Sequence, residues 1–224
     1  MGIIKKTIYT GVFTGLGVVG YLGASTTLAR PLPRDDPLFS SKVYAQYNQY
    51  RNGSAQDMVV KRIPLSKIRP ELLQNEGDLT VEFCRGVWSG LGYRLQRAVL
   101  ARKYQGPETA GQLWTVPQLE QSTYEVGTQI TDHFEVVDKT PTEITVRCGD
   151  TPRNPAPRES DGLFVISAEI DRERQEAVLG LKSCFFVSAR RIEGIHGPMP
   201  DWIEVLHCWY SRLWLETGSW RVTR

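Results

Sequence analysis

The sequence has no excess of charge of either sign. Its 27 Lys and Arg residues are balanced by 25 Asp and Glu residues, for a formal net charge of +2. Nucleic-acid-binding domains carry a basic excess that neutralises phosphates, so we expect no nucleic-acid partner. Hydrophobic residues make up 41% and charged residues 23% of the chain. This composition is typical of a packed protein rather than a disordered one.

The residues that build metal and nucleophile sites are also scarce, with three His and four Cys in 224 residues. The cysteines have no C-x-x-C spacing and are expected as buried thiols; a Cys148–Cys184 bridge would need a lumenal body. The E-x-x-H pattern Glu193–His196 lies among Gly and Pro, unlike the helical motifs of di-iron bundles. The stretch Gly86–Gly90 misses the G-x-S-x-G elbow by one place. We therefore expect no metal and no catalytic triad.

Residues 7–29 form a run without charge, preceded by Lys5 and Lys6 and followed by Arg30. A helix of this length can cross the hydrocarbon core of a bilayer. We predict that residues 1–29 are a single-pass membrane anchor in the endoplasmic reticulum or another endomembrane, and that the membrane is a partner. A signal peptide cleaved near Gly23–Ser25, a mitochondrial presequence and a packed helix remain alternatives.

Two other short motifs bear on compartment and cofactor. The lysines and arginines around the run leave the side of the membrane open, but Asn52-Gly53-Ser54 is an acceptor for N-glycosylation if the body is lumenal. The glycines of residues 15–20 match the G-x-G-x-x-G dinucleotide fingerprint. The Pro-containing, charged segment after them cannot be the second strand that this fingerprint requires. We expect no cofactor.

The remaining chain divides into a polar linker at 30–57 and a single ligand-binding domain at 58–224. In chain order, apolar spacing predicts a strand at Met58–Ile63, helices at Leu65–Gln74 and 79–103, strands at Thr128–Val137, Glu143–Cys148, Gly162–Ile170 and Ala177–Ser188, and a helix over 201–217. This order predicts an α+β fold in which a curved antiparallel sheet wraps a long C-terminal helix. It resembles the helix-grip order of START-like proteins, with a lipocalin-like or other α+β barrel as the alternative. Such folds hold apolar ligands in a cavity between sheet and helix.

Strand alternation selects Asp132 as a candidate catalytic residue. In Thr128–Val137, Asp132 has the same parity as Ile130 and Phe134, so its carboxyl group is expected on an apolar face. Burial there would raise its pKa and suit a general acid. The alternative is a buried carboxylate satisfied by an arginine or by backbone amides. His133 has the opposite parity and is expected to face away.

The same alternation predicts the walls of the cavity. We expect Ile130, Phe134, Phe164 and Ile166 to contact substrate from the sheet. Trp202 and Trp209 share one face of the final helix and are expected to contact it from the other side. Core packing, or contact with a membrane, is the alternative for these tryptophans.

Several longer stretches carry a family resemblance, among them VVKRIPLSKIRPELL (59–73), GVWSGLGYRLQR (86–97) and YEVGTQITDHFEVVDKTPTEITVRCGD (124–150). They resemble a group of small fungal proteins with an apolar N-terminal segment that accompany natural-product gene sets, a group similar to a norbornene-forming Diels–Alderase. The resemblance implies a cofactor-independent cyclase or isomerase for an apolar terpenoid or polyketide intermediate of secondary metabolism. The alternatives are a membrane-tethered carrier of lipids or small molecules and a scaffold of an organelle membrane.

Overall fold

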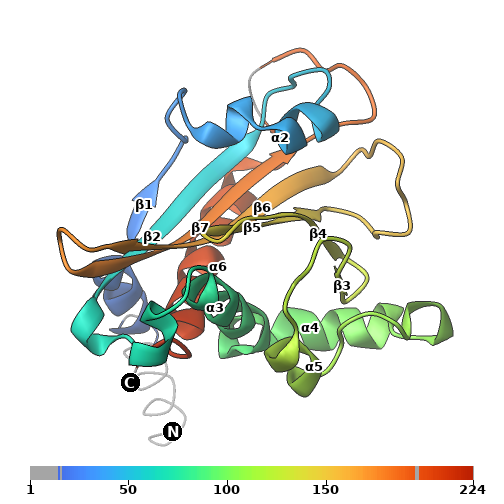
Figure 1. Cartoon of the computed structure of the whole chain (residues 1–224). Helices are drawn as coiled ribbons and strands as arrows, with labels where there is room; N and C mark the ends of the chain where they lie inside the picture. Colours follow the sequence, from blue (N-terminus) through green and yellow to red (C-terminus); the bar gives the residue numbers. More distant parts are fainter. Residues whose placement is uncertain (1–14, 16, 195–196, 224) are drawn as a thin grey trace, which may run out of the picture.

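The computed structural model describes residues 15, 17–194 and 197–223 and shows a mixed α+β fold (Figure 1). One antiparallel sheet has the strand order β1-β2-β7-β6-β5-β4-β3. The strands are β1 (Thr27–Ala29), β2 (Ala55–Pro64), β3 (Gln129–Ile130), β4 (Phe134–Lys139), β5 (Glu143–Cys148), β6 (Asp161–Asp171) and β7 (Glu176–Phe186). The helices are α2 (Lys42–Tyr47), α3 (Asp78–Ser89), α4 (Leu91–Tyr104), α5 (Val116–Gln121) and α6 (Asp201–Ser219), with short 3-10 turns η1 (Pro37–Ser40), η2 (Leu65–Lys67), η3 (Pro70–Leu73) and η4 (Pro107–Thr109).

The sheet has β1 and β3 at its two edges, and its first long strand, β2, pairs with its last strand, β7. β2 lies antiparallel to β7 from the Ala55–Phe185 pair to the Pro64–Glu176 pair. β7 continues into the long hairpin with β6, and β5 and β4 follow in order. The predictions of an antiparallel sheet and of a long C-terminal helix are confirmed.

Helices α3, α4, α5 and α6 cover one face of the sheet, and α6 packs directly against α3 and α4 (Figure 1). The predicted helix over 79–103 is two helices that meet at Gly90. Glycine is needed where α3 and α6 cross, since a Cβ on Gly86 would overlap the carbonyl oxygen of Gly218. Trp88 is fully buried at this crossing, with its ring 5.5 Å from that of Trp214.

The opposite face of the sheet is covered by the segment that the sequence indicated as a linker. Within residues 30–57, η1 and α2 pack Leu38, Val43 and Tyr44 onto the face that carries Leu163 and Phe186. Figure 1 shows α2 on the side of the sheet away from α6. This segment belongs to the folded body, because its apolar side chains close a second small core.

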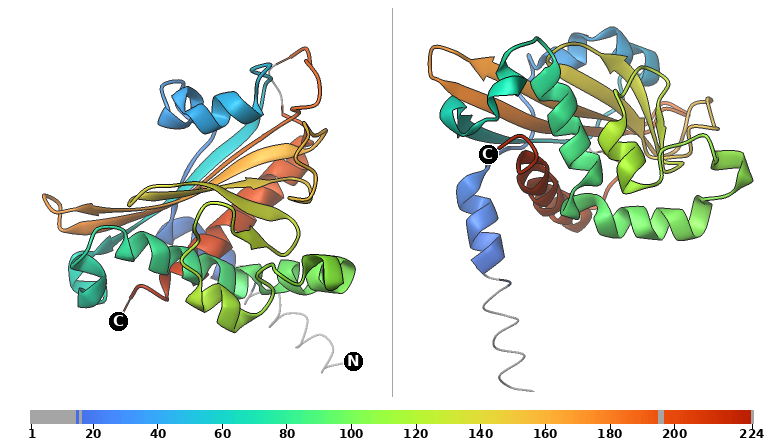
Figure 2. Two further views of the ribbon diagram at one scale, coloured as in Figure 1. Left: turned by 45° about the vertical axis from the view of Figure 1, so that its right-hand side comes forward. Right: turned by 60° about the horizontal axis from the view of Figure 1, so that its bottom comes forward.

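The N-terminal segment is also attached to the body where it is described. Residues 17–25 are helical, and β1 then adds to the edge of β2. Arg212 of α6 donates to the carbonyl oxygens of Leu22 (3.1 Å) and Thr26 (2.9 Å), and the Tyr21 hydroxyl donates to Glu216 (2.9 Å). The right-hand view of Figure 2 shows this helix beside α6.

The predicted membrane anchor lies partly outside the described residues, which exclude 1–14 and 16. Within the described part, no helix combines the length and the apolar character that crossing a bilayer requires.

Two predictions that concern compartment are changed by the packing. The Asn52 side chain is buried, and its Nδ2 donates to the carbonyl oxygens of Val187 (2.7 Å) and Arg190 (2.8 Å). The atom to which a glycan would be attached is therefore occupied in the folded protein. Cys148 faces the helices while Cys184 lies in the core under α2, so the two are not bridged; all four cysteines are buried free thiols, as predicted.

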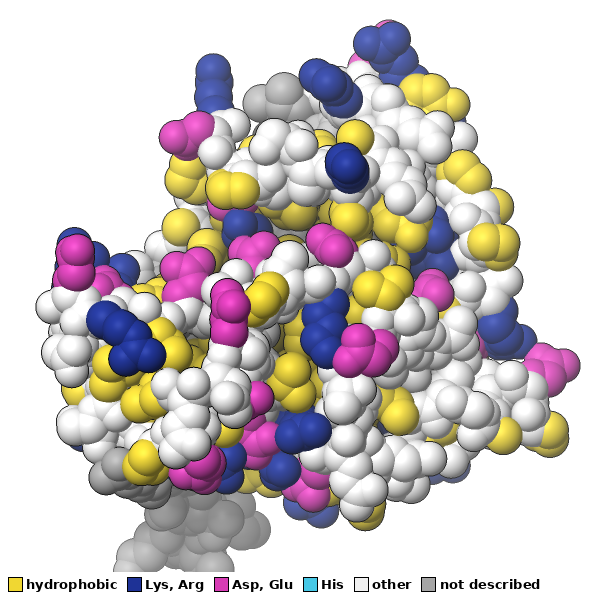
Figure 3. All heavy atoms as spheres, in the orientation of Figure 1, with side chains coloured by type: hydrophobic (Ala, Val, Ile, Leu, Met, Phe, Trp, Pro, Cys, Tyr) yellow, Lys and Arg dark blue, Asp and Glu magenta, His cyan; other side chains and the backbone are white. Residues whose placement is uncertain are grey.

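The surface mixes charges of both signs, as the composition requires. On the face in Figure 3, Lys and Arg side chains alternate with Asp and Glu side chains. Interior ion pairs add to this balance: Lys182, on the α2 side of β7, lies 2.6 Å from Asp36.

Candidate functional site

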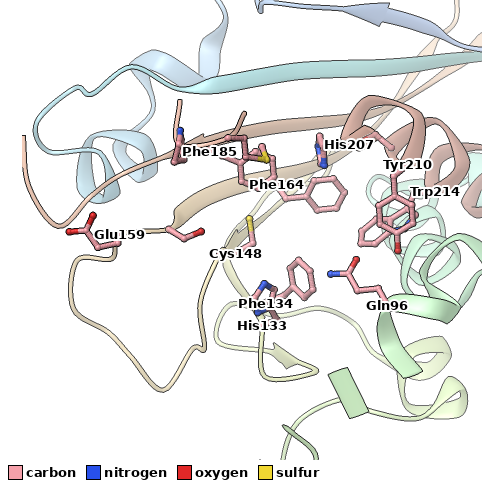
Figure 4. A pocket seen from close by; sticks show the side chains of 15 residues that line it. Gln96, His133, Phe134, Cys148, Glu159, Phe164, Phe185, His207, Tyr210 and Trp214 are labelled. Atoms are coloured by element: carbon pink, nitrogen blue, oxygen red, sulfur yellow. The ribbon is translucent and has the colours of Figure 1, made fainter. Parts of the chain in front are cut away.

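A cavity of about 430 Å³ lies between the sheet and helix α6. Side chains from α4, the β3–β4 turn, β5, β6, β7 and α6 converge on it (Figure 4). Its lining residues are Gln96, His133, Phe134, Cys148, Gly149, Glu159, Ser160, Phe164, Phe185, Pro198, Met199, His207, Tyr210, Ser211 and Trp214. This volume is in the range of small-molecule sites.

Aromatic rings form most of the walls. Phe164 and Phe185 point to the same side of the sheet because Phe185 pairs with Gly162, two residues before Phe164. On α6, Trp214 lies 5.6 Å from Phe164 and 5.1 Å from Tyr210, measured between ring centroids. The Trp214 indole is fixed by a 3.0 Å hydrogen bond to the carbonyl oxygen of Gly92. The apolar surface is therefore formed before any ligand arrives.

The sheet residues predicted to contact substrate divide into two groups. Phe134 and Phe164 line the cavity. Ile130 and Ile166 are fully buried members of the main core and do not line it. Alternation identified the correct face of the sheet, but the cavity occupies only the part of that face near the β3–β4 turn and the ends of β5 to β7.

The tryptophans predicted to face the ligand lie elsewhere. Trp202 is 64% exposed and Trp209 is 37% exposed, and neither lines the cavity. The inward face of α6 is instead that of His207, Tyr210 and Trp214. Both faces carry aromatic residues, so helical periodicity alone could not show which one is covered by the sheet.

Asp132 does not have the environment that strand alternation predicts. The strand is interrupted here, since Thr131 and Asp132 both have left-handed backbone angles (φ 50° and 51°). Its carboxylate accepts hydrogen bonds from Arg153 Nη2 (2.8 Å), Thr151 Oγ1 (2.8 Å) and Gln112 Nε2 (3.1 Å). The Asp132 side chain is a buried carboxylate paired with an arginine, which was the alternative prediction.

The charge balance around Asp132 also removes the basis for a general acid. Burial alone would raise its pKa, but the hydrogen bonds from Arg153, Thr151 and Gln112 outweigh it and lower the pKa below its usual value. The predicted raised pKa is wrong, and Asp132 does not line the cavity.

His133, which was expected to face away, lines the cavity instead. The left-handed turn at Thr131 and Asp132 reverses the alternation and places the imidazole beside Phe134, 5.2 Å between ring centroids. Burial lowers the pKa of His133, while the nearby Asp150 acts in the opposite direction. This imidazole is therefore neutral at neutral pH and can either donate or accept a hydrogen bond.

The Tyr210 hydroxyl is a polar group that the sequence did not reveal. Its oxygen is buried and has no hydrogen-bond partner among the described residues. Burial raises the pKa of Tyr210 to about 12, with the Trp214 indole offsetting part of the rise. Tyr210 therefore contributes its ring to the cavity wall, while its hydroxyl oxygen lies in the packed interior, out of reach of a molecule in the cavity.

His207 forms the second polar feature of the cavity. Its Nε2 lies 3.0 Å from Ser183 Oγ, 3.2 Å from Ser211 Oγ and 3.3 Å from Asp57 Oδ2. Asp57 comes from β2, directly opposite Ser183 of β7. Asp57 is 4% exposed, and its second oxygen, Oδ1, has no partner in the described part of the chain. A sequence signal for Asp57 exists, since it alternates with the buried Ala55 and Val59 in β2.

The residues that the structure describes contain no group of three or more His, Cys, Asp or Glu side chains placed to hold a metal ion. His196, part of the E-x-x-H pattern considered above, lies outside those residues. Comparisons with protein-family models, with curated proteins and with solved structures found no match.

Proposed function

We infer that this protein is a cofactor-independent cyclase or isomerase that folds an apolar, carbonyl-bearing terpenoid or polyketide intermediate in its cavity. The observation that carries the inference is an aromatic cavity with the neutral imidazole of His133 in its wall. A carbonyl oxygen on the ligand would accept a hydrogen bond from this imidazole, while the rest of the ligand would contact Phe134, Phe164 and Trp214.

Two physical effects support catalysis without a cofactor. Holding the two ends of a flexible molecule in a reactive arrangement can supply several kcal/mol of the barrier. A hydrogen bond from His133 to a conjugated carbonyl would withdraw electron density from the adjacent double bond, which favours a Diels–Alderase-like cyclisation. Such a donor acts most strongly where water is excluded.

The topology is in keeping with this function. Pairing of the first long strand with the last, together with α6 packed against one face of the sheet, favours a helix-grip arrangement. In that arrangement the ligand lies between the sheet and the final helix, where the cavity is. A place in fungal secondary metabolism follows from the family resemblance of the sequence and is part of the same proposal.

The test begins with the unknown substrate. A strain that lacks the gene is expected to accumulate an uncyclised or unisomerised intermediate, which is then incubated with purified protein. His133→Phe is expected to lower turnover by about 10²-fold, the usual effect of removing one such donor, because the new ring keeps a flat apolar wall but cannot donate a hydrogen bond. Tyr50→Phe, on an exposed ring, is the control and should turn over normally. Equal turnover by the His133→Phe variant and the wild type would remove the donor role.

One observation favours a second candidate, a membrane-tethered carrier that binds its ligand without converting it. Trp202, Leu206 and Trp209 are exposed along the outer side of α6. The Trp209 ring lies 3.8 Å from the position of a Cβ on Gly23, so this row adjoins the N-terminal helix. Aromatic residues of this kind favour membrane interfaces. Co-purification of a lipid, with no product formed from any accumulated intermediate, would select the carrier.

A further inference from the structure

The outer face of helix α4 carries a row of exposed apolar side chains. Leu91, Leu95 and Val99 follow one another at intervals of four residues, so they lie along one side of the helix. They are 58%, 76% and 56% exposed, and Leu95 is more exposed than any other large hydrophobic residue that the structure describes. A continuous apolar row that no described element covers is typical of a surface that binds a partner.

The charged residues of α4 are all basic. Arg94, Arg97, Arg102 and Lys103 lie within its 14 residues, and the helix contains no Asp or Glu. Arg94, Arg102 and Lys103 are exposed beside the apolar row. Among the described residues, no carboxylate forms an ion pair with any of the four. The positive charge around the row is therefore uncompensated, which favours an anionic partner.

We propose that the outer face of α4 docks on the surface of an anionic phospholipid bilayer. Basic amphipathic helices lie in the plane of the membrane interface, with their apolar side chains between the lipid headgroups and their Lys and Arg side chains at the phosphates. The apolar row of α4 supplies the first contact, and the basic side chains around it supply the second. The proposal does not depend on the catalytic function proposed above, because it concerns only this outer surface.

A second apolar surface lies on the same side of the molecule. The N-terminal helix exposes Val18, Val19 and Tyr21 and belongs to the uncharged run at residues 7–29. Figure 1 and the right-hand view of Figure 2 show α4 along the lower side of the body, the side on which the N-terminal helix also lies. Two weak membrane contacts on one side of a protein hold it far more firmly than either does alone.

Other partners fit this surface less well. In a two-fold contact with a second copy of the chain, the basic residues of one α4 would face those of the other, and like charges repel. A nucleic acid would bind through its phosphates and leave Leu95 and Val99 in water. An acidic protein would satisfy the charge but gives no reason for the apolar helix on the same side. A bilayer accounts for the apolar row, the charge and the neighbouring helix together.

A fluorescent label on α4 tests the contact directly in the full chain. The four native cysteines are buried, so an environment-sensitive dye attached through Leu95→Cys reports on the α4 face alone. Its emission is expected to shift to shorter wavelength when vesicles of phosphatidylcholine and phosphatidylserine in equal parts are added, because the dye enters an apolar environment. The control is dye attached through Lys42→Cys, on the exposed surface of α2, which should not shift.

Three results of this experiment would overturn the proposal. An unchanged emission of the α4 label, whether or not the protein sediments with the vesicles, would show that this face does not meet the bilayer. Equal shifts of the α4 and α2 labels would show that α4 does not orient the protein on the membrane. A shift of the α4 label that needs no vesicles and grows with protein concentration would identify a second copy as the occupant.

The second test isolates the charge. The measured quantity is the ratio of two affinities of the full chain, one for the phosphatidylserine-containing vesicles and one for vesicles of phosphatidylcholine alone. An uncharged segment contributes equally to both, so it cancels. The combined variant Arg94→Gln, Arg102→Gln and Lys103→Gln is expected to lower this ratio by about 10²-fold, since each basic residue near an anionic surface contributes about fivefold.

The matched control removes the same number of charges from the α2 side of the sheet. It combines Arg34→Gln, Lys42→Gln and Arg51→Gln, all at exposed positions. Its ratio of affinities should stay close to that of the wild type, because charges held beyond the screening length from the bilayer contribute little. Equal losses in the two combined variants would show that net charge rather than α4 directs the binding, and would overturn the proposal.

Discussion

Arg147 and Asp161 form a two-point ion pair in the interior of the protein. Arg147 Nε lies 2.9 Å from Asp161 Oδ1, and Nη2 lies 2.7 Å from Oδ2, with the two side chains 4% and 0% exposed. Arg147 Nη2 also donates to the carbonyl oxygen of Ala156, and its guanidinium lies 4.3 Å from the centre of the Tyr47 ring. One side chain thus connects β5 and β6 to α2 and to the 149–160 loop that borders the cavity.

Arg147→Ala is expected to lower the free energy of unfolding by about 3–5 kcal/mol, because it leaves the Asp161 carboxylate buried without its cation. Urea unfolding measures the change. The matched control is Arg190→Ala, which removes an ion pair with Glu159 in which both side chains are more than 60% exposed. That variant should change the free energy by less than about 1 kcal/mol. Similar losses in the two variants would contradict the structural role of Arg147.

The buried side-chain amide of Asn52 predicts a loss of stability when it is removed and the absence of a glycan on the folded protein. Asn52→Ala is expected to lower the free energy of unfolding by about 1–3 kcal/mol, since the carbonyl oxygens of Val187 and Arg190 and the amide of Ile192 lose their partner. Ser54→Ala destroys the same glycosylation motif but leaves these bonds in place, and should be close to neutral. Urea unfolding of the two variants separates the effects. A glycosidase-sensitive mass shift in the folded wild-type protein would contradict the buried position of Asn52.

The elements that the sequence predicted best are strands, whose signals lie in residues close together along the chain. Glu143–Cys148 was predicted as a strand and is β5, and the hairpin of β6 and β7 lies within one or two residues of its predicted ends. Alternation and turn residues are local signals, so they located these strands. Alternation failed at Thr131 and Asp132, where two left-handed residues interrupt the strand and exchange the directions of Asp132 and His133. Such a turn is held by distant contacts, including that of Tyr93 with Thr131.

The candidate site depends on contacts that no local pattern contains. Asp57 and His207 meet because β2 pairs with β7 and α6 packs across both strands. The sequence placed Asp57 at the end of a linker and gave His207 no partner. The orphaned hydroxyl of Tyr210 is likewise visible only once Trp214 and α4 are in position around it.

The buried thiol of Cys184 predicts a pH dependence of stability. Burial raises the pKa of Cys184 to about 11 from its ordinary value of 9.0. The unfolded chain therefore ionises first as pH rises, so stability is full below pH 9 and falls progressively up to about pH 11. A shift of this size corresponds to about 2–3 kcal/mol. Unfolding in urea at intervals from pH 8 to about pH 11 measures it.

The control for this prediction is Cys184→Ala, which removes the titrating group. Its free energy of unfolding starts lower, because a buried sulfur is lost. It should then decline less steeply between pH 9 and about pH 11 than that of the wild type. Parallel curves for the two proteins would show that this thiol ionises equally well in the folded state.

Gly92 connects helix packing to the shape of the cavity. A Cβ at this position would lie 2.8 Å from Thr217 Oγ1, 2.8 Å from Trp214 Cδ1 and 2.9 Å from Trp214 Cα. Backbone atoms of α6 cannot yield as a flexible side chain would. Gly92→Ala must therefore move α4 away from α6 and displace Trp214, whose indole is bound to the Gly92 carbonyl oxygen and forms a wall of the cavity.

Gly92→Ala is accordingly expected to lower the free energy of unfolding by about 1–3 kcal/mol, the usual cost of overpacking. It should also weaken the binding of the fluorescent probe anilinonaphthalene sulfonate, because the wall of the cavity formed by Trp214 shifts. Gly111→Ala is the control, since a Cβ there meets no atom within 4 Å. Urea unfolding and probe fluorescence are measured on both variants. If Gly92→Ala loses stability but binds the probe as tightly as the wild type, the probe does not contact Trp214. The probe then does not occupy the cavity proposed as the ligand site.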